Sequence, residues 1–170
     1  AIAMIPQEPV LFQESLRYNC DPFEQHSCEE IWAALEESQL APWVRERNAA
    51  EESLEKLLTL EIKEGGQNLS VGQRQMVAIA RAVLRQSKLV VLDEATAAID
   101  AQTDAQIQRA IRRCFENATS LTIAHRLQTI LDSDRIMVLA QGEIVELASP
   151  DELRARDGGV FRSMLESADE

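Results

Sequence analysis

The sequence predicts an α/β fold with a largely parallel sheet, because apolar strands and amphipathic helices alternate along most of the chain. Apolar residues recur at helical spacing over 70–86, and a short apolar strand follows directly at 88–93. The same order returns with a helix around 107–114 and a strand at 120–124. Strands joined through helices in this way pair side by side and parallel.

A single domain is expected over 1–170, and it has two parts. Residues 9–69, approximately, do not follow the alternation and are predicted to form a helical insertion. The α/β core is then expected to comprise 1–8 and 70–170.

Local signals predict the remaining elements. Two of the helices begin with a serine followed three residues later by glutamate, the spacing of a capping box. In chain order the sequence predicts a strand over 1–5 ended by Pro6, a loop over 7–25, a helix capped at 27–30, a short helix over 42–44, a partly helical stretch over 51–62, a hairpin of 135–139 and 143–147, a helix capped at 149–152, and a final helix over 160–166.

The charge balance excludes some functions. There are 29 acidic residues against 17 basic ones, and the net charge is −12. We therefore expect no nucleic-acid partner, because such a surface needs clustered Lys and Arg to neutralise phosphates. No apolar run approaches the ~20 residues that a membrane span requires. Three cysteines without a CxxC pair are typical of a reducing compartment.

Two carboxylates, Asp93 and Glu94, follow the apolar strand 89–92 directly. In open α/β sheets, ligands bind at the carboxyl ends of the strands. One carboxylate can hold Mg²⁺ through water while its neighbour polarises an attacking water. Taken alone, the pair is equally well explained as the end of a strand before a turn.

A possible anion site lies at the start of the helix over 70–86. Ser70 and Gln73 have capping-box spacing, so the serine is expected at the helix N-terminus, where backbone N–H groups and the helix dipole favour anions. Gly72 leaves room for a phosphate to approach the backbone. An isolated S-x-x-Q pattern is, however, more often an ordinary capped helix.

Taken together, five motifs resemble the nucleotide-binding domain of an ATP-binding cassette (ABC) transporter. They follow the order of that family along the chain and cover nearly all of it. The motifs are Ile5–Glu8 (Q-loop), Leu69–Gln73 (signature), Leu89–Glu94 (Walker B), Ala97–Asp100 (D-loop) and Ile123–Arg126 (switch histidine). The resemblance implies part of a RecA-like P-loop NTPase core with an inserted helical subdomain.

The resemblance also implies ATP and Mg²⁺ as cofactors and assigns roles to matching positions. Gln7 would bind Mg²⁺ or the attacking water, and Asp93 would hold Mg²⁺ through water. Glu94 would act as general base. His125 would contact the γ-phosphate, although a lone histidine after a strand is otherwise more often structural.

Further roles concern a partner domain. In the family, two nucleotide-binding domains form a head-to-tail dimer, so Ser70, Gly72 and Gln73 would hold ATP bound to the opposite domain. Asp100 would lie at the dimer contact. The resemblance further implies transmembrane domains of the same transporter as partners, with this domain on the cytoplasmic face of a membrane.

A finer match points to the C subfamily, which includes the multidrug-resistance-associated exporters, and to its second nucleotide-binding domain. The segments 7–12, 15–17 and 21–23 carry this match, and the motif segments 69–75 and 93–100 point the same way. Val71 replaces a usual signature glycine, as in domains whose signature serves the less active of two sites. Glu94 is intact, which fits the hydrolytic site. The resemblance thus implies an ATPase that powers export.

One motif of such a domain does not occur in the sequence. None of the six glycines begins a Gly-Lys-Ser or Gly-Lys-Thr, so the G-x-x-x-x-G-K-[ST] phosphate loop is missing from these 170 residues. We therefore expect the chain alone to bind ATP weakly and not to hydrolyse it measurably. Without the first strand and helix of the core, apolar surface should be left uncovered.

Two other functions share these motifs. The first is a regulatory nucleotide-binding module of a channel-type relative in the C subfamily, in which binding matters more than turnover. The second is a non-transport ABC ATPase acting in DNA repair, chromosome structure or translation. The acidic balance and the absence of long heptads disfavour the second alternative.

Overall fold

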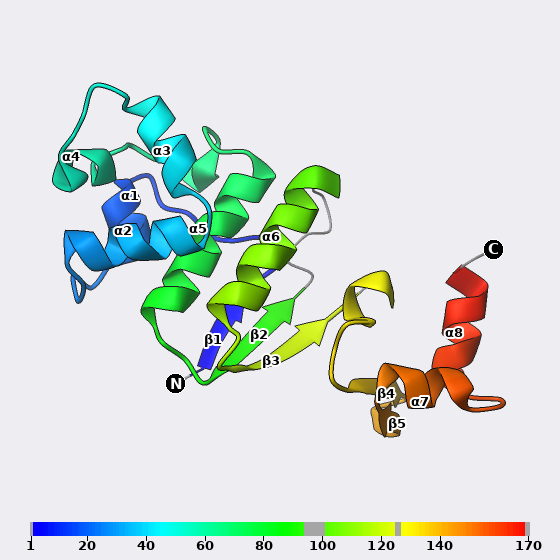
Figure 1. The fold of residues 1–170 in the computed structure, drawn as a ribbon. Helices are drawn as coiled ribbons and strands as arrows, with labels where there is room; N and C mark the ends of the chain where they lie inside the picture. Colours follow the sequence, from blue (N-terminus) through cyan, green and yellow to red (C-terminus); the bar gives the residue numbers. More distant parts are fainter. Residues whose placement is uncertain (1, 94–100, 125–126, 169–170) are drawn as a thin grey trace. The chain divides into compact units, whose positions relative to one another are not determined.

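The computed structural model describes residues 2–93, 101–124 and 127–168. The chain divides into two compact units, Ala1–Ile123 and Ala124–Glu170, which are described separately (Figure 1). No helix among the described residues is long and apolar enough to cross a membrane.

A parallel sheet forms the centre of the first unit, as predicted. Its strands are β1 (Ile2–Ile5), β2 (Leu89–Asp93) and β3 (Thr119–Ile123), in the order β1-β2-β3. Ile5 lies beside Leu92 in the register of the first pair, and Asp93 lies beside Ile123 in the second. The carboxyl ends of all three strands therefore lie along one edge of the sheet.

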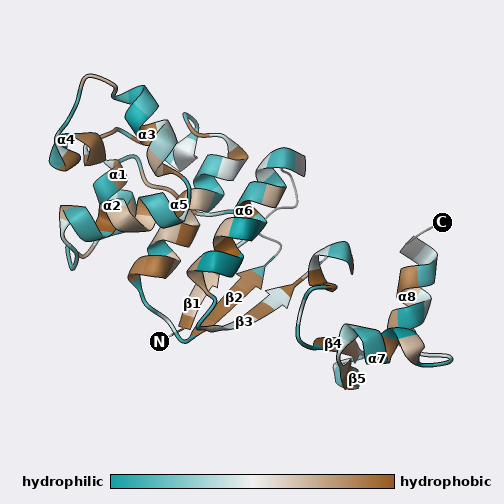
Figure 2. Cartoon of the chain, in the orientation of Figure 1, coloured by the Kyte–Doolittle hydropathy of each residue, from teal (hydrophilic) through white to brown (hydrophobic). Residues whose placement is uncertain are grey.

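Two long helices lie over one side of this sheet, α5 (Val71–Leu84) and α6 (Ala101–Cys114) (Figure 1). In β1 and β2 the residues that alternate toward this side are buried, and we call them the covered face: Ala3, Ile5, Val90 and Leu92. Their partners in β3, Ser120 and Thr122, are exposed. Figure 2 shows β1 and β2 as hydrophobic, whereas α6 carries a hydrophilic band along its outer side. The helices thus place apolar residues on the sheet and polar residues toward solvent.

The other side of the sheet is apolar as well, but it is exposed within this chain. Exposed apolar residues of β1 and β3 on this side form what we call the open face: Ile2, Met4, Leu121 and Ile123, each between 46% and 62% exposed. Leu89 and Val91 of the central strand, on the same side, are half-buried. The prediction of uncovered apolar surface is confirmed here.

Between β1 and α5 the chain is helical, with α1 (Leu16–Cys20), α2 (Cys28–Glu37), α3 (Ala41–Arg47), α4 (Leu54–Leu58) and a 3₁₀ turn, η1 (Glu64–Gly66). Ser27 and Glu30 form the predicted capping box of α2. The helix predicted over 42–44 is longer than expected. It begins at Ala41, has Pro42 in its first turn and continues to Arg47. The assignment of 9–69 as an insertion within a single domain stays a prediction.

Helix α1 lies inside a segment predicted to be a loop, so that prediction was wrong at this point. The helix is only five residues long, and contacts distant in sequence stabilise it. Leu16 N donates to Leu60 O at 2.8 Å, and Ser15 pairs with Glu61 as an isolated β-bridge. Such contacts leave no periodic signal in the local sequence.

The second unit contains η2 (Leu127–Ile130), the antiparallel pair β4 (Ile136–Ala140) and β5 (Glu143–Ala148), α7 (Pro150–Ala155) and α8 (Val160–Ala168). The predicted hairpin is confirmed, and Gln141 and Gly142 turn it with positive φ angles of 51° and 83°. The predicted capping box of Ser149 and Glu152 is also present. A small core holds this unit together, formed by Ile136, Val138, Ala148, Leu153 and Phe161.

Candidate functional site

The predicted site segments follow the carboxyl ends of the three parallel strands. Asp93 is the last residue of the middle strand β2, and its side chain is partly exposed. Gln7 follows β1 by two residues, and its side chain is exposed. Because these ends share one edge of the sheet, the fold brings Asp93 and the Gln7 segment to the same side. The predicted residues Glu94, Asp100 and His125 lie outside the described residues.

The signature segment forms the N-terminus of α5. Ser70 Oγ accepts a hydrogen bond from Gln73 N at 3.2 Å, and Gln73 Oε1 accepts one from Ser70 N at 2.8 Å, so the predicted capping box is present. The box satisfies the N–H of the third helical residue, whereas the first turn of any α-helix contains N–H groups without a partner inside the helix. With Ser70 exposed, this end of α5 has the chemistry of an anion site.

Gly72 is buried, and the structure gives a reason for the glycine that the sequence did not reveal. A Cβ added at Gly72 would lie 2.5 Å from the Cγ2 methyl of Thr103, in the first turn of α6. The missing side chain therefore leaves room for α6, and the room for a phosphate that we expected from the sequence stays a prediction. Close packing at this point fixes the signature turn against the helix that begins at Ala101.

One turn beyond Gly72, the buried Gln75 contacts the segment after β1. Its Nε2 donates to Pro6 O at 3.1 Å and to Gln7 O at 2.6 Å. Gln75 is 1% exposed, and its Oε1 has no hydrogen-bond partner among the described residues. The sequence placed Gln75 within a motif but gave it no role. The sequence did contain a signal for this contact, because Gln75 lies on the same helical face as the apolar Met76 and Ile79. A glutamine on a buried face needs a hydrogen-bond partner, which predicts a specific contact.

Arg81, near the end of α5, holds the same segment further along. Its guanidinium donates to Val10 O at 2.7 Å, to Asn19 O and to Asn19 Oδ1 at 3.2 Å. Burial lowers the pKa of Arg81, but an arginine stays charged at neutral pH. Asn19 is itself fully buried and exchanges hydrogen bonds with the backbone of Phe12 at 2.9 Å and 3.0 Å. Helix α5 therefore anchors the chain on both sides of the Gln7 side chain.

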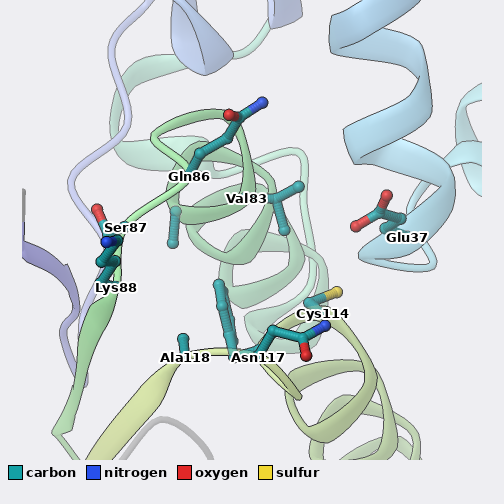
Figure 3. Close-up of a pocket in the computed structure, with 10 residues that line it drawn as sticks. Glu37, Val83, Gln86, Ser87, Lys88, Cys114, Asn117 and Ala118 are labelled. Atoms are coloured by element: carbon teal, nitrogen blue, oxygen red, sulfur yellow. The ribbon is translucent and has the colours of Figure 1, made fainter.

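A surface pocket lies elsewhere. It is lined by residues at the C-terminal ends of α2, α5 and α6 and at the start of β2, among them Glu37, Ser87, Lys88 and Cys114 (Figure 3). Because β2 begins here and Asp93 ends it, this pocket is at the opposite edge of the sheet from the candidate site. Burial raises the pKa of the Cys114 thiol to about 11, so the thiol is protonated and a weak nucleophile.

Comparisons with known proteins agree with this geometry. The family described as ABC transporter matches residues 1–97. ATP-binding cassette sub-family C member 2 of Rattus norvegicus is 52% identical over 94% of this chain and 10% of its own length. Multidrug resistance protein mrp-7 of Caenorhabditis elegans is 50% identical over 99% of this chain and 11% of its own. The chain thus spans about a tenth of the length of these curated relatives.

The fold has a solved counterpart. The structure of a bacterial Atm1-family ABC exporter with ATP bound matches with a TM-score of 0.84 and 33% identity, covering 100% of this chain and 28% of that one. The helices on a parallel sheet are thus part of a P-loop NTPase fold. The chain belongs to the ABC transporter family, as nucleotide-binding-domain sequence of the multidrug-resistance-associated type in its C subfamily.

Proposed function

We propose that this chain forms the water-activating and signature-bearing part of a nucleotide-binding domain that hydrolyses ATP to power export through transmembrane domains of the same transporter. The observation that carries the proposal is the position of Asp93. It ends the central parallel strand at the edge of the sheet that the Gln7 segment shares. A sheet of this kind binds its ligand at that edge.

The residues at this edge fit Mg²⁺. Asp93 and Gln7 offer oxygen ligands, which Mg²⁺ prefers, and Asp93 is accessible enough to act through water. Among the described residues no group of three or more His, Cys, Asp or Glu is arranged as a metal site. Mg²⁺ in NTPases needs no such group, because waters and substrate phosphates complete its shell. The ion would neutralise the charge that develops on the phosphates.

Residues outside the described ranges complete the proposed reaction. Glu94 accepts a proton from the attacking water, or orients that water. His125 donates to the γ-phosphate. A phosphate-binding loop is needed to hold ATP, and in this proposal a longer chain supplies it, since the 170 residues contain no Gly-Lys-Ser or Gly-Lys-Thr.

The signature turn acts on a second nucleotide-binding domain. Ser70, Gly72 and Gln73 form the capped N-terminus of a 14-residue helix, and the dipole of such a helix favours an anion at this end. We place them against the ATP of the opposite domain, with Asp100 at the contact between the domains. Val71 then belongs to the signature of the less active site.

An exposed apolar surface supports a membrane-domain partner. Downstream of Gln7, the side chains of Val10 and Phe23 are 68% and 75% exposed. The rings of Phe12 and Tyr18 meet edge-on between these positions in the sequence, with centroids 6.0 Å apart. Exposed apolar side chains in one segment are expected where a partner protein docks. We propose that the transmembrane domains dock here, at the cytoplasmic face of a membrane.

The decisive test is Glu94→Gln in the full-length transporter. The amide cannot take up a proton, so turnover of ATP should fall by about a hundredfold or more while ATP binding is retained. Steady-state ATPase assays and nucleotide binding measure the two quantities. Glu116→Gln, an exposed position beyond α6, is the matched control and should leave both unchanged. Unchanged ATPase activity in Glu94→Gln would overturn the proposal.

A further inference from the structure

The hydrogen bonds of Gln75 connect two parts of the molecule that have different proposed roles. Gln75 belongs to α5, whose first residues form the signature, and its partners are the carbonyls of Pro6 and Gln7. The two segments are 68 and 69 residues apart in sequence. Gln7, whose side chain is proposed to meet Mg²⁺ or water, thus has its own backbone carbonyl held by α5.

The identity of the donor follows from chemistry. Both partners of the Gln75 amide are carbonyl oxygens, which only accept hydrogen bonds, so the atom facing them must be the nitrogen. A side-chain NH₂ group has two protons, one for each carbonyl. Glutamate has the same shape but only acceptors when ionised, and methionine has nearly the same length but no donor. Glutamine is therefore specifically suited to this position.

The two hydrogen bonds of Gln75 hold the backbone beyond the end of β1, where hydrogen bonds between strands no longer hold it. β1 ends at Ile5, and its pairing with β2 ends at the same residue. A second anchor lies at Val10, whose carbonyl accepts from Arg81 at 2.7 Å. Between these anchors the side chain of Gln7 is exposed, so its direction depends on the backbone conformation that the anchors fix.

We propose that Gln75 is a positioning residue of the ATP site: its amide fixes the backbone at Gln7 and thereby directs the Gln7 side chain toward Mg²⁺ or the attacking water. The inference rests on the proposed function of this edge of the sheet. It makes α5 a shared element, because the helix supplies the signature at one end and holds the Gln7 segment one turn later.

The test compares Gln75→Met and Gln75→Glu with Met76→Leu in the full-length transporter. Met76 is the neighbouring buried residue on α5, and its exchange for leucine conserves volume, so this variant controls for repacking. Without the amide, kcat should fall about tenfold or more, as expected for a misplaced group. The KM for ATP and the thermal midpoint of Gln75→Met should stay near those of Met76→Leu, whereas the buried carboxylate of Gln75→Glu should lower the midpoint. The Mg²⁺ concentration for half-maximal activity should rise.

A second readout needs neither nucleotide nor turnover. In the nucleotide-free protein, hydrogen–deuterium exchange of the peptide around residues 6–10 should quicken in Gln75→Met, while peptides from β2 should exchange as before. The glutamate variant should show the larger effect, since a carboxylate repels both carbonyls. A Gln75→Met protein that keeps full kcat overturns the inference. So does exchange that quickens uniformly through the first unit, which would indicate a purely structural role.

Glu94→Gln in the same assays separates this inference from the function on which it rests. If Glu94→Gln loses turnover and Gln75→Met does not, only the role of Gln75 is wrong. If the parent protein does not hydrolyse ATP, or Glu94→Gln keeps its activity, the proposed function fails and the positioning role fails with it.

Discussion

Both faces of the three-stranded sheet carry apolar residues, but these residues differ in their exposure. On the covered face, Ala3, Ile5, Val90 and Leu92 are at most 5% exposed beneath α5 and α6. On the open face, Ile2, Met4, Leu121 and Ile123 are 46–62% exposed. Parallel sheets are normally covered on both sides. We therefore expect a further layer to cover the open face. The candidate site lies at the edge of the sheet between these two faces.

The largest expected effect tests this asymmetry directly. Val90→Asp buries an unpaired charge and should lower the free energy of unfolding by more than about 4 kcal/mol. Leu121→Asp on the open face should cost about 1 kcal/mol or less in the 170-residue chain. Urea-induced unfolding followed by circular dichroism compares the two. Equal losses would show that the open face is already covered in solution, for example by self-association.

The second prediction concerns the contact between the two covering helices. Gly72→Ala pushes a methyl group against Thr103 Cγ2 and should cost about 1–3 kcal/mol of stability. Thr103→Ser deletes that methyl, so the double variant should regain most of the loss. Val71→Ala, in the same turn, should change stability by about 0.5 kcal/mol or less. A double variant as unstable as Gly72→Ala alone would exclude Thr103 as the cause.

A smaller effect is expected from charges placed on the open face. Met4→Lys together with Ile123→Lys should reduce self-association of the 170-residue chain, since lysine on an exposed sheet opposes pairing. Sedimentation velocity measures the change. In the full-length transporter the same pair should lower stability instead, because there the face is expected to be buried. If the double variant leaves the stability of the full-length transporter unchanged, the open face is not covered there.

The smallest effect uses two of the three native cysteines of the first unit. Burial raises the pKa of Cys20 to about 12 and that of Cys114 to about 11. At pH 8 both should alkylate slowly, Cys20 more slowly than the partly exposed Cys114, and both should react fast in urea. Because the unfolded thiol ionises first, stability should fall as the pH rises from 9 toward 12. Mass spectrometry of the labelled peptides gives the rates, and a fast Cys20 would contradict its burial.

Signals confined to a few neighbouring residues were sufficient to predict much of the fold. The serines at positions 27, 70 and 149 each cap a helix with the acceptor three residues later, as their spacing indicated. The apolar run before Asp93 forms a central strand, and the turn at Gln141 and Gly142 joins a hairpin. Each of these depends on hydrogen bonds or periodicity within one element.

The features that sequence could not predict all depend on distant partners. Helix α1 is stabilised by Leu60 and Arg81, far along the chain. Gly72 is small because of Thr103, which belongs to another helix. Gln75 was recognisable as part of a motif, but its partners at Pro6 and Gln7 became visible only once β1 and α5 were placed together. For Glu94, Asp100 and His125 the sequence motif remains the basis of the assignment.

The two hydrogen bonds of Gln75 have a consequence for a dimer in which α5 serves one site with its N-terminus and the other through Gln7. Linkage requires that any such coupling be reciprocal. If ATP at the opposite domain tightens Mg²⁺ binding at this one by some factor, Mg²⁺ here must tighten ATP binding there by the same factor. Removing the Gln75 amide should reduce both factors together. An ATP titration at one site and a Mg²⁺ titration at the other would then both measure the coupling through the two hydrogen bonds of Gln75.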